Sequence, residues 1–207
     1  MWLRCPSCAR RIPSLALSVD ANASYTRRDA DVLAQLDEFG LLMIEQPLPM
    51  DDLQGHAELA QRLRTPVCLD ESIESLEQAR IALDAGACAI VNIKAGRVGG
   101  YLESRRIHDH CQGRQTPVWC GGMLETGVGR AANLALAALP NFTLPGDISS
   151  SSRYWTRDTL TRPLEAEDGL MTVPRRDGFG VDIDGEWLDE VTASTTAVPL
   201  SPGSRPH

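Results

Sequence analysis

Short apolar runs alternate with amphipathic segments along most of the chain. The amphipathic segments place apolar residues at the spacing of one helix face, and the runs between them have the length of buried strands. Strands that alternate with helices in this strict order are typical of βα units, which build a parallel sheet. The predicted strands are residues 15–22, 41–48, 66–72, 89–96, 117–123 and 142–149, and the predicted helices are residues 27–39, 53–63, 75–85, 101–111 and 127–139.

The alternation is lost at both ends of the chain. Residues 1–12 have no period of their own, and the sequence after residue 150 is polar with short extended pieces. The end of the chain is rich in Pro and Ser, a composition that does not support a packed core. We therefore expect an atypical segment at 1–12, one α/β domain with a carboxy-terminal extension at 13–188, and a disordered tail at 189–207.

Composition narrows the class of protein. The chain has 207 residues, 43% of them hydrophobic, which is enough for a sizeable core. Its net charge is −8 and no stripe of Lys and Arg with interleaved aromatic residues occurs, so we expect no nucleic-acid partner. No apolar run has the length of a membrane span or of a signal peptide, so we expect a soluble cytoplasmic protein without a membrane partner.

Charged residues end the first four predicted strands. Asp20, Glu45, Asp70 and Lys94 follow one another at about 25 residues, the length of one βα repeat. Because side chains alternate between the faces of a strand, each shares its face with the residue two positions earlier. The opposite face carries Val19, Ile44, Leu69 and Ile93, which suit packing under helices.

This periodic chemistry predicts a site at the rim of a βα barrel. Catalytic groups of such barrels gather at the carboxyl ends of the strands. Three carboxylates that converge without a counter-charge repel one another, and a hard divalent cation such as Mg²⁺ resolves that conflict. Mn²⁺ or another divalent cation is an alternative. For any one of these residues alone, a solvated strand end is the simpler interpretation.

Five motifs resemble the enolase superfamily, and within it the muconate-lactonizing subgroup that includes o-succinylbenzoate synthases and N-acylamino acid racemases. The similarity covers roughly residues 13–185. The motifs are VDAN at 19–22, IEQPL at 44–48, CLDES at 68–72, VNIKAGRVGG at 91–100 and GGMLETGVGR at 121–130.

The resemblance implies a role for each charged residue. Asp20, Glu45 and Asp70 would be the Mg²⁺ ligands, and Lys94 would be the catalytic lysine on the far side of a small carboxylate substrate. Removal of a proton alpha to the substrate carboxylate would then give an enediolate, the chemistry that the superfamily is known for. A lysine near a cation should have a lowered pKa, so we expect this of Lys94.

Further residues are expected to support these groups. Asn22 and Glu71 would orient ligands from a second layer, although a turn or helix-cap role explains either one as well. Asn92 shares the face of Lys94 and is expected to contact substrate. The loop after the fifth strand is expected to line the pocket through Gly121, Gly122, Met123 and Glu125, although a plain tight turn also explains the two glycines.

The chain departs from the family at its amino-terminal side. Relatives carry a capping domain and two further barrel strands, the second with a Lys-x-Lys pair, whereas no Lys precedes Lys94 here. The expected fold is therefore an incomplete TIM-like (β/α)7β barrel that lacks the capping domain and the first two strands. Its open edges would favour association, so a homo-oligomer is an expected partner.

The implied activity is that of a Mg²⁺-dependent o-succinylbenzoate synthase, a lyase of menaquinone biosynthesis, in a truncated form whose stand-alone activity is in question. N-acylamino acid racemase, muconate cycloisomerase and dipeptide epimerase are alternatives from the same subgroup. A non-catalytic remnant that binds a carboxylate or a partner is the alternative from another class.

Overall fold

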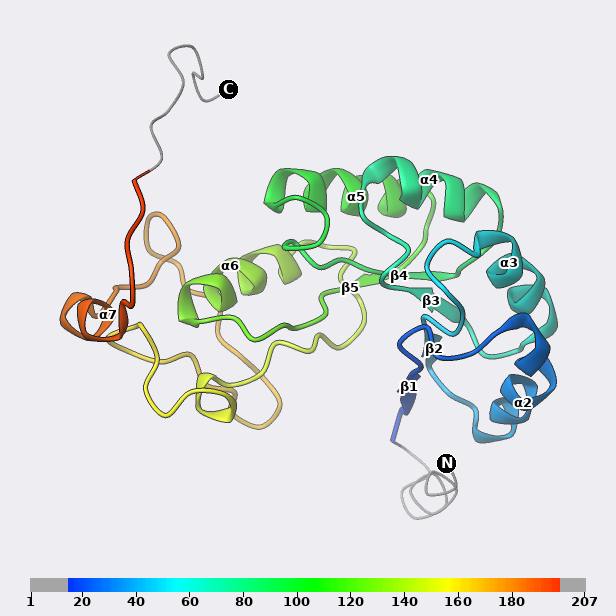
Figure 1. Cartoon of the computed structure of the whole chain (residues 1–207), viewed down its shortest axis with the longest axis horizontal. Helices are drawn as coiled ribbons and strands as arrows, with labels where there is room; N and C mark the ends of the chain where they lie inside the picture. The colour runs from blue at the N-terminus through cyan, green and yellow to red at the C-terminus, as the bar shows by residue number, and fades with distance from the viewer. Residues whose placement is uncertain (1–14, 198–207) are drawn as a thin grey trace, which may run out of the picture.

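The computed structural model of the chain describes residues 15–197. Its described part contains one parallel sheet whose strands follow the order of the sequence, as the βα pattern predicts (Figure 1). Asp20 pairs with Glu45 in register, and Glu45 pairs with Cys68, so the carboxyl ends of neighbouring strands meet at one edge. The strands are β1 (Ser18–Asp20), β2 (Met43–Glu45), β3 (Val67–Leu69), β4 (Ile90–Asn92) and β5 (Val118–Trp119).

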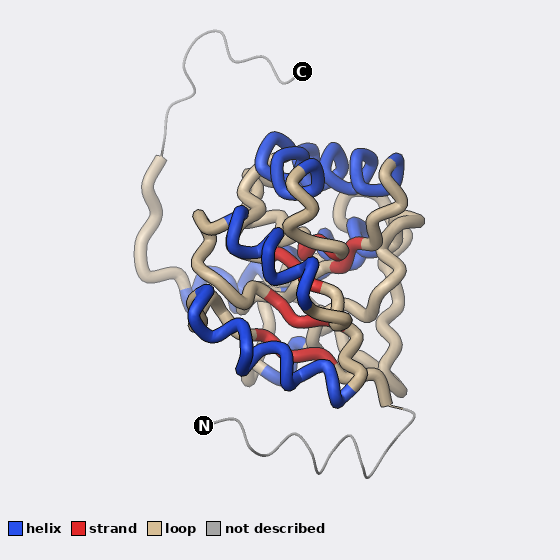
Figure 2. Tube along the Cα trace, turned by 90° about the vertical axis from the view of Figure 1, so that its right-hand side faces the viewer, coloured by secondary structure: helices blue, strands red, loops and turns tan. Residues whose placement is uncertain are grey.

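Helices connect successive strands and cover one side of the sheet (Figure 2). Ser75 begins one of them, because its side chain accepts a hydrogen bond from the backbone N–H of Gln78. Asp52 caps another in the same way through Gly55. The helices are α2 (Ala30–Ala34), α3 (Leu53–Arg62), α4 (Leu76–Asp84), α5 (Tyr101–Gly113), α6 (Gly127–Ala137) and α7 (Gly185–Val191), with 3-10 turns η1 (Arg27–Asp29), η2 (Gln35–Phe39) and η3 (Ser151–Arg153).

The two faces of the sheet bury different cores. The large core lies under the helices and includes Ile44, Leu69 and Ile93, with Val19 packed against it. A small core on the inner face joins Met43, Cys68, Ile90 and Trp119. The assignment of faces from strand alternation is therefore confirmed, and it directs the side chains that end the strands to the inner side.

The prediction of a sixth strand is wrong. Residues 142–149 contribute only an isolated bridge between Phe142 and Val118. Pro145 has no N–H to donate, so this segment cannot continue a ladder through it. The chain returns to β5 further on, where the N–H of Asp147 donates to the carbonyl of Cys120 at 3.0 Å. The α/β class with a partial barrel is confirmed.

The first predicted helix is also interrupted. Residues 27–39 form η1, α2 and η2 in place of one continuous helix. The Asp37 carboxylate accepts hydrogen bonds from the N–H groups of Arg64 and Thr65 at 2.9 and 2.8 Å, which ties the last turn to the loop before β3. Gly40 then ends the segment with a left-handed conformation, φ 58°.

The carboxy-terminal extension contains little regular structure among the described residues. α7 continues to Val191, so the predicted boundary at 188 falls inside a helix, and the predicted tail does not begin at 189. Residues 192–197 form neither helix nor strand, and residues 198–207 lie outside the described range, as does the predicted segment 1–12. Within residues 15–197, no helix combines the length and apolar character that a membrane crossing requires.

Candidate active site

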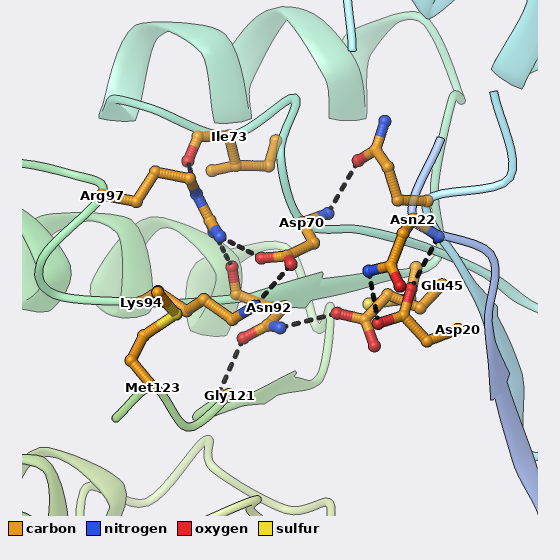
Figure 3. Close-up of polar contacts among 12 residues, drawn as sticks. Asp20, Asn22, Glu45, Asp70, Ile73, Asn92, Lys94, Arg97, Gly121 and Met123 are labelled. Atoms are coloured by element: carbon orange, nitrogen blue, oxygen red, sulfur yellow. Dashed lines mark hydrogen bonds and ion pairs between the residues drawn. The ribbon is translucent and has the colours of Figure 1, made fainter. Parts of the chain in front are cut away.

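The carboxyl ends of β1 to β4 bring four predicted residues to the same rim (Figure 3). Asp20 and Glu45 are the last residues of their strands, Asp70 follows β3 directly, and Lys94 lies two residues beyond β4. A cavity of about 420 Å³ lies between β1 and residues 145–147, and Asp20, Glu45 and Lys94 are among its lining residues. Three of the four predicted residues thus line one cavity, and Asp70 lines a second cavity that also includes Lys94.

Asn22 holds the carboxylate of Asp20 at both oxygens. Its backbone N–H donates to Oδ1 at 2.9 Å, and its side-chain Nδ2 donates to Oδ2 at 2.8 Å. Asn22 adopts a positive φ of 43°, a conformation that Asn tolerates better than most residues. This is the contact expected of a residue that orients Asp20.

Glu45 is a buried carboxylate whose loss of hydration is only partly offset by hydrogen bonding. Burial raises its pKa, the hydrogen bond from Asn92 at 2.7 Å lowers it, and the charges of Asp20 and Asp70 raise it again, to about 8. The cause is a concentration of negative charge in a partly desolvated place. Such a group is stabilised by an added cation.

Asp70 is paired with two cations. Its Oδ2 accepts from Lys94 Nζ at 2.6 Å, and its Oδ1 accepts from the guanidinium of Arg97. Arg97 also donates to the carbonyls of Ile73 at 2.8 Å and Asn92 at 2.7 Å, so it is held in one orientation. Sequence reasoning missed Arg97. The available signal was its position three residues after Lys94, in the same strand-to-helix loop.

The expectation for Lys94 is wrong in this arrangement. Burial lowers the pKa of Lys94, but the hydrogen bond and charge of Asp70, together with the charge of Glu45, raise it by more, and the net shift is upward. The expectation assumed a cation as the nearest charged neighbour, whereas the nearest group is a carboxylate. Lys94 is therefore a fixed ammonium in this arrangement.

Asn92 lies inside the protein and joins three strands. It is fully buried, its Nδ2 donates to Glu45, and its Oδ1 accepts from the N–H of Gly121 at 2.8 Å. Asn92 is absent from the residues that line the cavity beside Asp20, Glu45 and Lys94. The structure shows the contacts of Asn92 with Glu45 and the backbone, and its contact with substrate stays a prediction.

Close approach explains the two predicted glycines. A Cβ on Gly121 would lie 2.5 Å from both Asn92 Nδ2 and Lys94 Cε. A Cβ on Gly122 would collide with the backbone carbonyl of Asp147. Both residues line the cavity beside Glu45, and their backbone approaches protein groups there.

A second cavity, of about 440 Å³, also has Lys94 among its lining residues. Its lining residues include Asp70, Glu71, Arg97 and Met123. Within the described part of the chain, the buried Oε2 of Glu71 has no hydrogen-bond partner. Glu71 and Met123 therefore lie next to Lys94, as the sequence predicts, although the side chain of Met123 is largely exposed.

The Glu125 carboxylate is bonded within its own loop and to α6. Its oxygens accept from the N–H of Met123 at 2.9 Å and from Asn133 Nδ2 at 2.8 Å, which closes its own loop onto α6. Glu125 is absent from the residues that line either cavity. A carboxylate with two such donors close by in the sequence and on the next helix is satisfied locally.

The three carboxylates match a divalent cation in chemistry. They supply hard oxygen atoms from adjacent strands, the ligand type that Mg²⁺ takes, and the raised pKa of Glu45 marks excess negative charge. Among residues 15–197, no three His, Cys, Asp or Glu side chains are gathered closely enough to hold an ion as they stand. Asp70 is directed toward Lys94 and Arg97 instead.

A curved parallel sheet under helices, with acids and a lysine at the carboxyl ends of its strands, defines the class of βα-barrel enzyme domains. The chain matches the family described as enolase C-terminal domain-like over residues 3–187. The chain belongs to this family, and members of the enolase superfamily generally depend on a divalent metal.

Named relatives narrow the comparison. An o-succinylbenzoate synthase from Geobacillus stearothermophilus is 57% identical over 183 residues, 88% of this chain and 49% of the relative. An N-succinylamino acid racemase from Amycolatopsis is 60% identical over 178 residues, 86% of this chain and 48% of the relative. The chain therefore spans about half the length of the curated relatives it matches.

Solved structures agree with the family assignment. A crystal structure of an enolase superfamily member from Listeria innocua is 42% identical with a TM-score of 0.88, covering 91% of this chain and 51% of that one. A muconate cycloisomerase from Pseudomonas fluorescens is 25% identical with a TM-score of 0.82. The resemblance to the muconate-lactonizing subgroup, nearest to its synthase and racemase members, is thus confirmed.

Proposed function

We propose that the chain carries the cation-binding and lysine-bearing part of an o-succinylbenzoate synthase, a lyase that removes water from a cyclohexadiene carboxylate in menaquinone biosynthesis. The observation that carries this proposal is that Asp20 and Glu45 share a cavity with Lys94, the sole lysine in the sequence, while Asp70 is bonded to Lys94 directly. The names of relatives from Geobacillus and Bacillus, at 57% and 51% identity, support the synthase. The synthase activity itself is proposed here, because the chain spans about half the length of the relatives that carry this name.

The three carboxylates would hold Mg²⁺, with Mn²⁺ as a substitute. Bound there, the cation would supply positive charge beside the substrate carboxylate. Asn22 holds Asp20, and Asn92 holds Glu45, so two of the three oxygen donors are oriented by protein amides. Their positions are therefore set before any ligand arrives.

Lys94 would stabilise the charge that develops as the alpha proton passes to a general base, the role that the family resemblance gives in the synthase to the lysine of the Lys-x-Lys pair. A proton alpha to a carboxylate is weakly acidic, and the enediolate that results carries a second negative charge, which preorganised cations stabilise. The Lys94 ammonium lines both cavities and is held at 2.6 Å by Asp70. Gly121 leaves room for the Lys94 side chain, because a Cβ there would lie 2.5 Å from Lys94 Cε.

Racemisation of an N-acylamino acid is the second candidate. The racemase from Amycolatopsis, at 60% identity, favours it. Both reactions begin with loss of a proton alpha to a carboxylate, so Lys94 and the three carboxylates would support the charged intermediate of either one. Muconate cycloisomerase chemistry has less support, since a chloromuconate cycloisomerase is 27% identical.

Exchange of the alpha proton tests the proposal on the purified 207-residue chain. The chain is incubated with Mg²⁺ in deuterated buffer, either with an N-succinylamino acid followed by proton NMR or with the cyclohexadiene carboxylate followed by its ultraviolet absorbance. Mg²⁺-dependent loss of the diene that disappears in Lys94→Ala supports the synthase. Exchange without dehydration favours the racemase.

A control and a contrary result complete the test. Arg105→Ala, on the exposed surface of α5, should behave as the unaltered chain. Metal binding with neither reaction would contradict an enzyme and favour the remnant that binds a carboxylate. Absence of any response to Mg²⁺ would contradict the cation site itself.

A further inference from the structure

Gln46 lies directly after β2 but does not line either cavity beside Lys94. It follows Glu45 directly, is fully buried, and has a positive φ of 35°, which is uncommon for a residue with a side chain. Its N–H donates to the carbonyl of Cys68 in β3 at 2.9 Å. Its carbonyl accepts from the N–H of Ala23, in the loop after β1, at 2.8 Å. The backbone of this one residue thus contacts the ends of both neighbouring strands.

The side chain of Gln46 extends these contacts to the loop after β3. Its Oε1 accepts from the N–H of Asp70 at 3.0 Å and from the N–H of Ser72 at 3.2 Å. Its Nε2 donates to the Ser72 hydroxyl at 2.8 Å and to the carbonyl of Leu48 at 3.1 Å. All four bonds are made inside the protein, and only an amide offers this combination of acceptor and donor.

We propose that Gln46 is a positioning residue that sets the spacing of Asp20, Glu45 and Asp70. It is bonded to the loop that follows Asp20, it is the residue after Glu45, and it holds the backbone N–H of Asp70 itself. A shift of its amide would move Asp70 relative to the other two carboxylates. The inference rests on the proposed function, because it assigns Gln46 a role in the affinity of the cation site.

A backbone conformation of this kind supports the assignment. Residues with a positive φ persist only when surrounding contacts hold them, and they concentrate at functional sites. The contacts that hold Gln46 are the same bonds that fix the loops after β1 and β3. The conformation and the spacing of the carboxylates are therefore coupled through one side chain.

Mn²⁺ affinity of the full chain, measured by electron paramagnetic resonance of the free ion, tests the role without relying on activity. Gln46→Met has a similar length but no amide, and it should weaken Mn²⁺ binding about 10- to 100-fold, the loss typical of residues that orient metal ligands. Gln46→Asn keeps the amide but withdraws it by one methylene, and a loss in the same direction is expected. Gln46→Asn provides the test if the Gln46→Met chain does not fold.

Asn141→Ala is the matched control. Its amide donates to the carbonyl of Thr116 at 2.7 Å, before β5 and away from the carboxylates. It should lower the melting temperature without changing Mn²⁺ affinity. Wild-type affinity in a folded Gln46→Met or Gln46→Asn chain would overturn the inference alone. Failure of the unaltered chain to bind Mn²⁺ would overturn the proposed function, and the role of Gln46 with it.

Discussion

Asp70 binds Lys94 through one carboxylate oxygen and Arg97 through the other, so a single buried acid joins the catalytic candidate to a residue that the sequence did not single out. Arg97 reaches two backbone carbonyls in addition, those of Ile73 and Asn92. The loop after β4 is therefore fastened to the end of β3. This fastening determines where Lys94 lies.

Replacing Arg97 by Met should destabilise the fold. Asp70 would keep one cation but lose the other, and two backbone carbonyls would lose their donor. Removing one partner of a buried ion pair costs about 3–5 kcal/mol, and the remaining bond to Lys94 reduces this to about 2–4 kcal/mol. Urea unfolding followed by circular dichroism measures the difference. Arg106→Met breaks an exposed pair with Glu103 and should cost less than about 1 kcal/mol. Equal losses would contradict the role given to Arg97.

Much of the fold follows from the sequence because each strand separates two environments. Ile44 packs under helices while Met43, one position earlier, packs inside, and the apolar alternation records this difference. The segment at 142–149 has a similar composition but makes a single bridge. A strand exists only through its neighbours, and an apolar pattern does not report how many of them are available to pair.

The residues of the candidate site likewise fall into those that the sequence predicts and those that it does not. Asp20, Glu45, Asp70 and Lys94 are predictable because they recur with the βα repeat, which places strand ends together. Gln46 and Arg97 depend on which loops lie side by side, since their partners are backbone groups about 24 residues away, one repeat along the chain. A sequence motif shows the residue but not the carbonyl or N–H that it meets. For the same reason, the sequence does not show that the Glu125 carboxylate accepts hydrogen bonds from Met123 and Asn133.

Gly122 should not tolerate a methyl group. Its Cβ would overlap the backbone carbonyl of Asp147, which is less able to move than a flexible side chain. Overpacking of this kind costs about 1–3 kcal/mol, so Gly122→Ala should lower the urea midpoint accordingly. Gly96→Ala is the matched control, because nothing lies within 4 Å of its added Cβ. A Gly122→Ala chain as stable as Gly96→Ala would show that residues 145–147 do not pack against this loop.

Two substitutions of Asn22 can separate the effect of its backbone conformation on stability from the effect of its side chain on the orientation of Asp20. At its φ of 43°, Gly is unstrained while Ala is strained, so Asn22→Gly should be more stable than Asn22→Ala by about 1 kcal/mol. Both variants lose the Nδ2 bond to Asp20 and should bind Mn²⁺ about 10-fold more weakly. Thermal unfolding and Mn²⁺ titration measure the two effects. Restoration of full affinity in Asn22→Gly would mean that the side chain does not orient Asp20.

His56 should make stability depend on pH below neutrality. It is fully buried, with Nδ1 2.8 Å from the carbonyl of Asp52 and Nε2 accepting from the N–H of Leu48 at 3.2 Å, so the neutral ring satisfies both contacts. Burial lowers its pKa below the ordinary 6.5, despite the opposing effect of Asp52. The unfolded chain therefore binds more protons than the folded chain below pH 6.5, and this contribution to stability is present above that pH and is lost as the pH falls through the lowered folded pKa.

The comparison with a variant isolates this contribution from that of the carboxylates. His56→Gln does not titrate in this range and offers an amide donor and acceptor to the same two backbone groups. It should be less stable than the unaltered chain at pH 7.5, because its shape differs, but the difference should shrink at pH 5.5. Urea midpoints at the two pH values give both numbers. A difference that stays constant or grows on acidification would contradict a neutral buried imidazole as the link between α3 and the loop after β2.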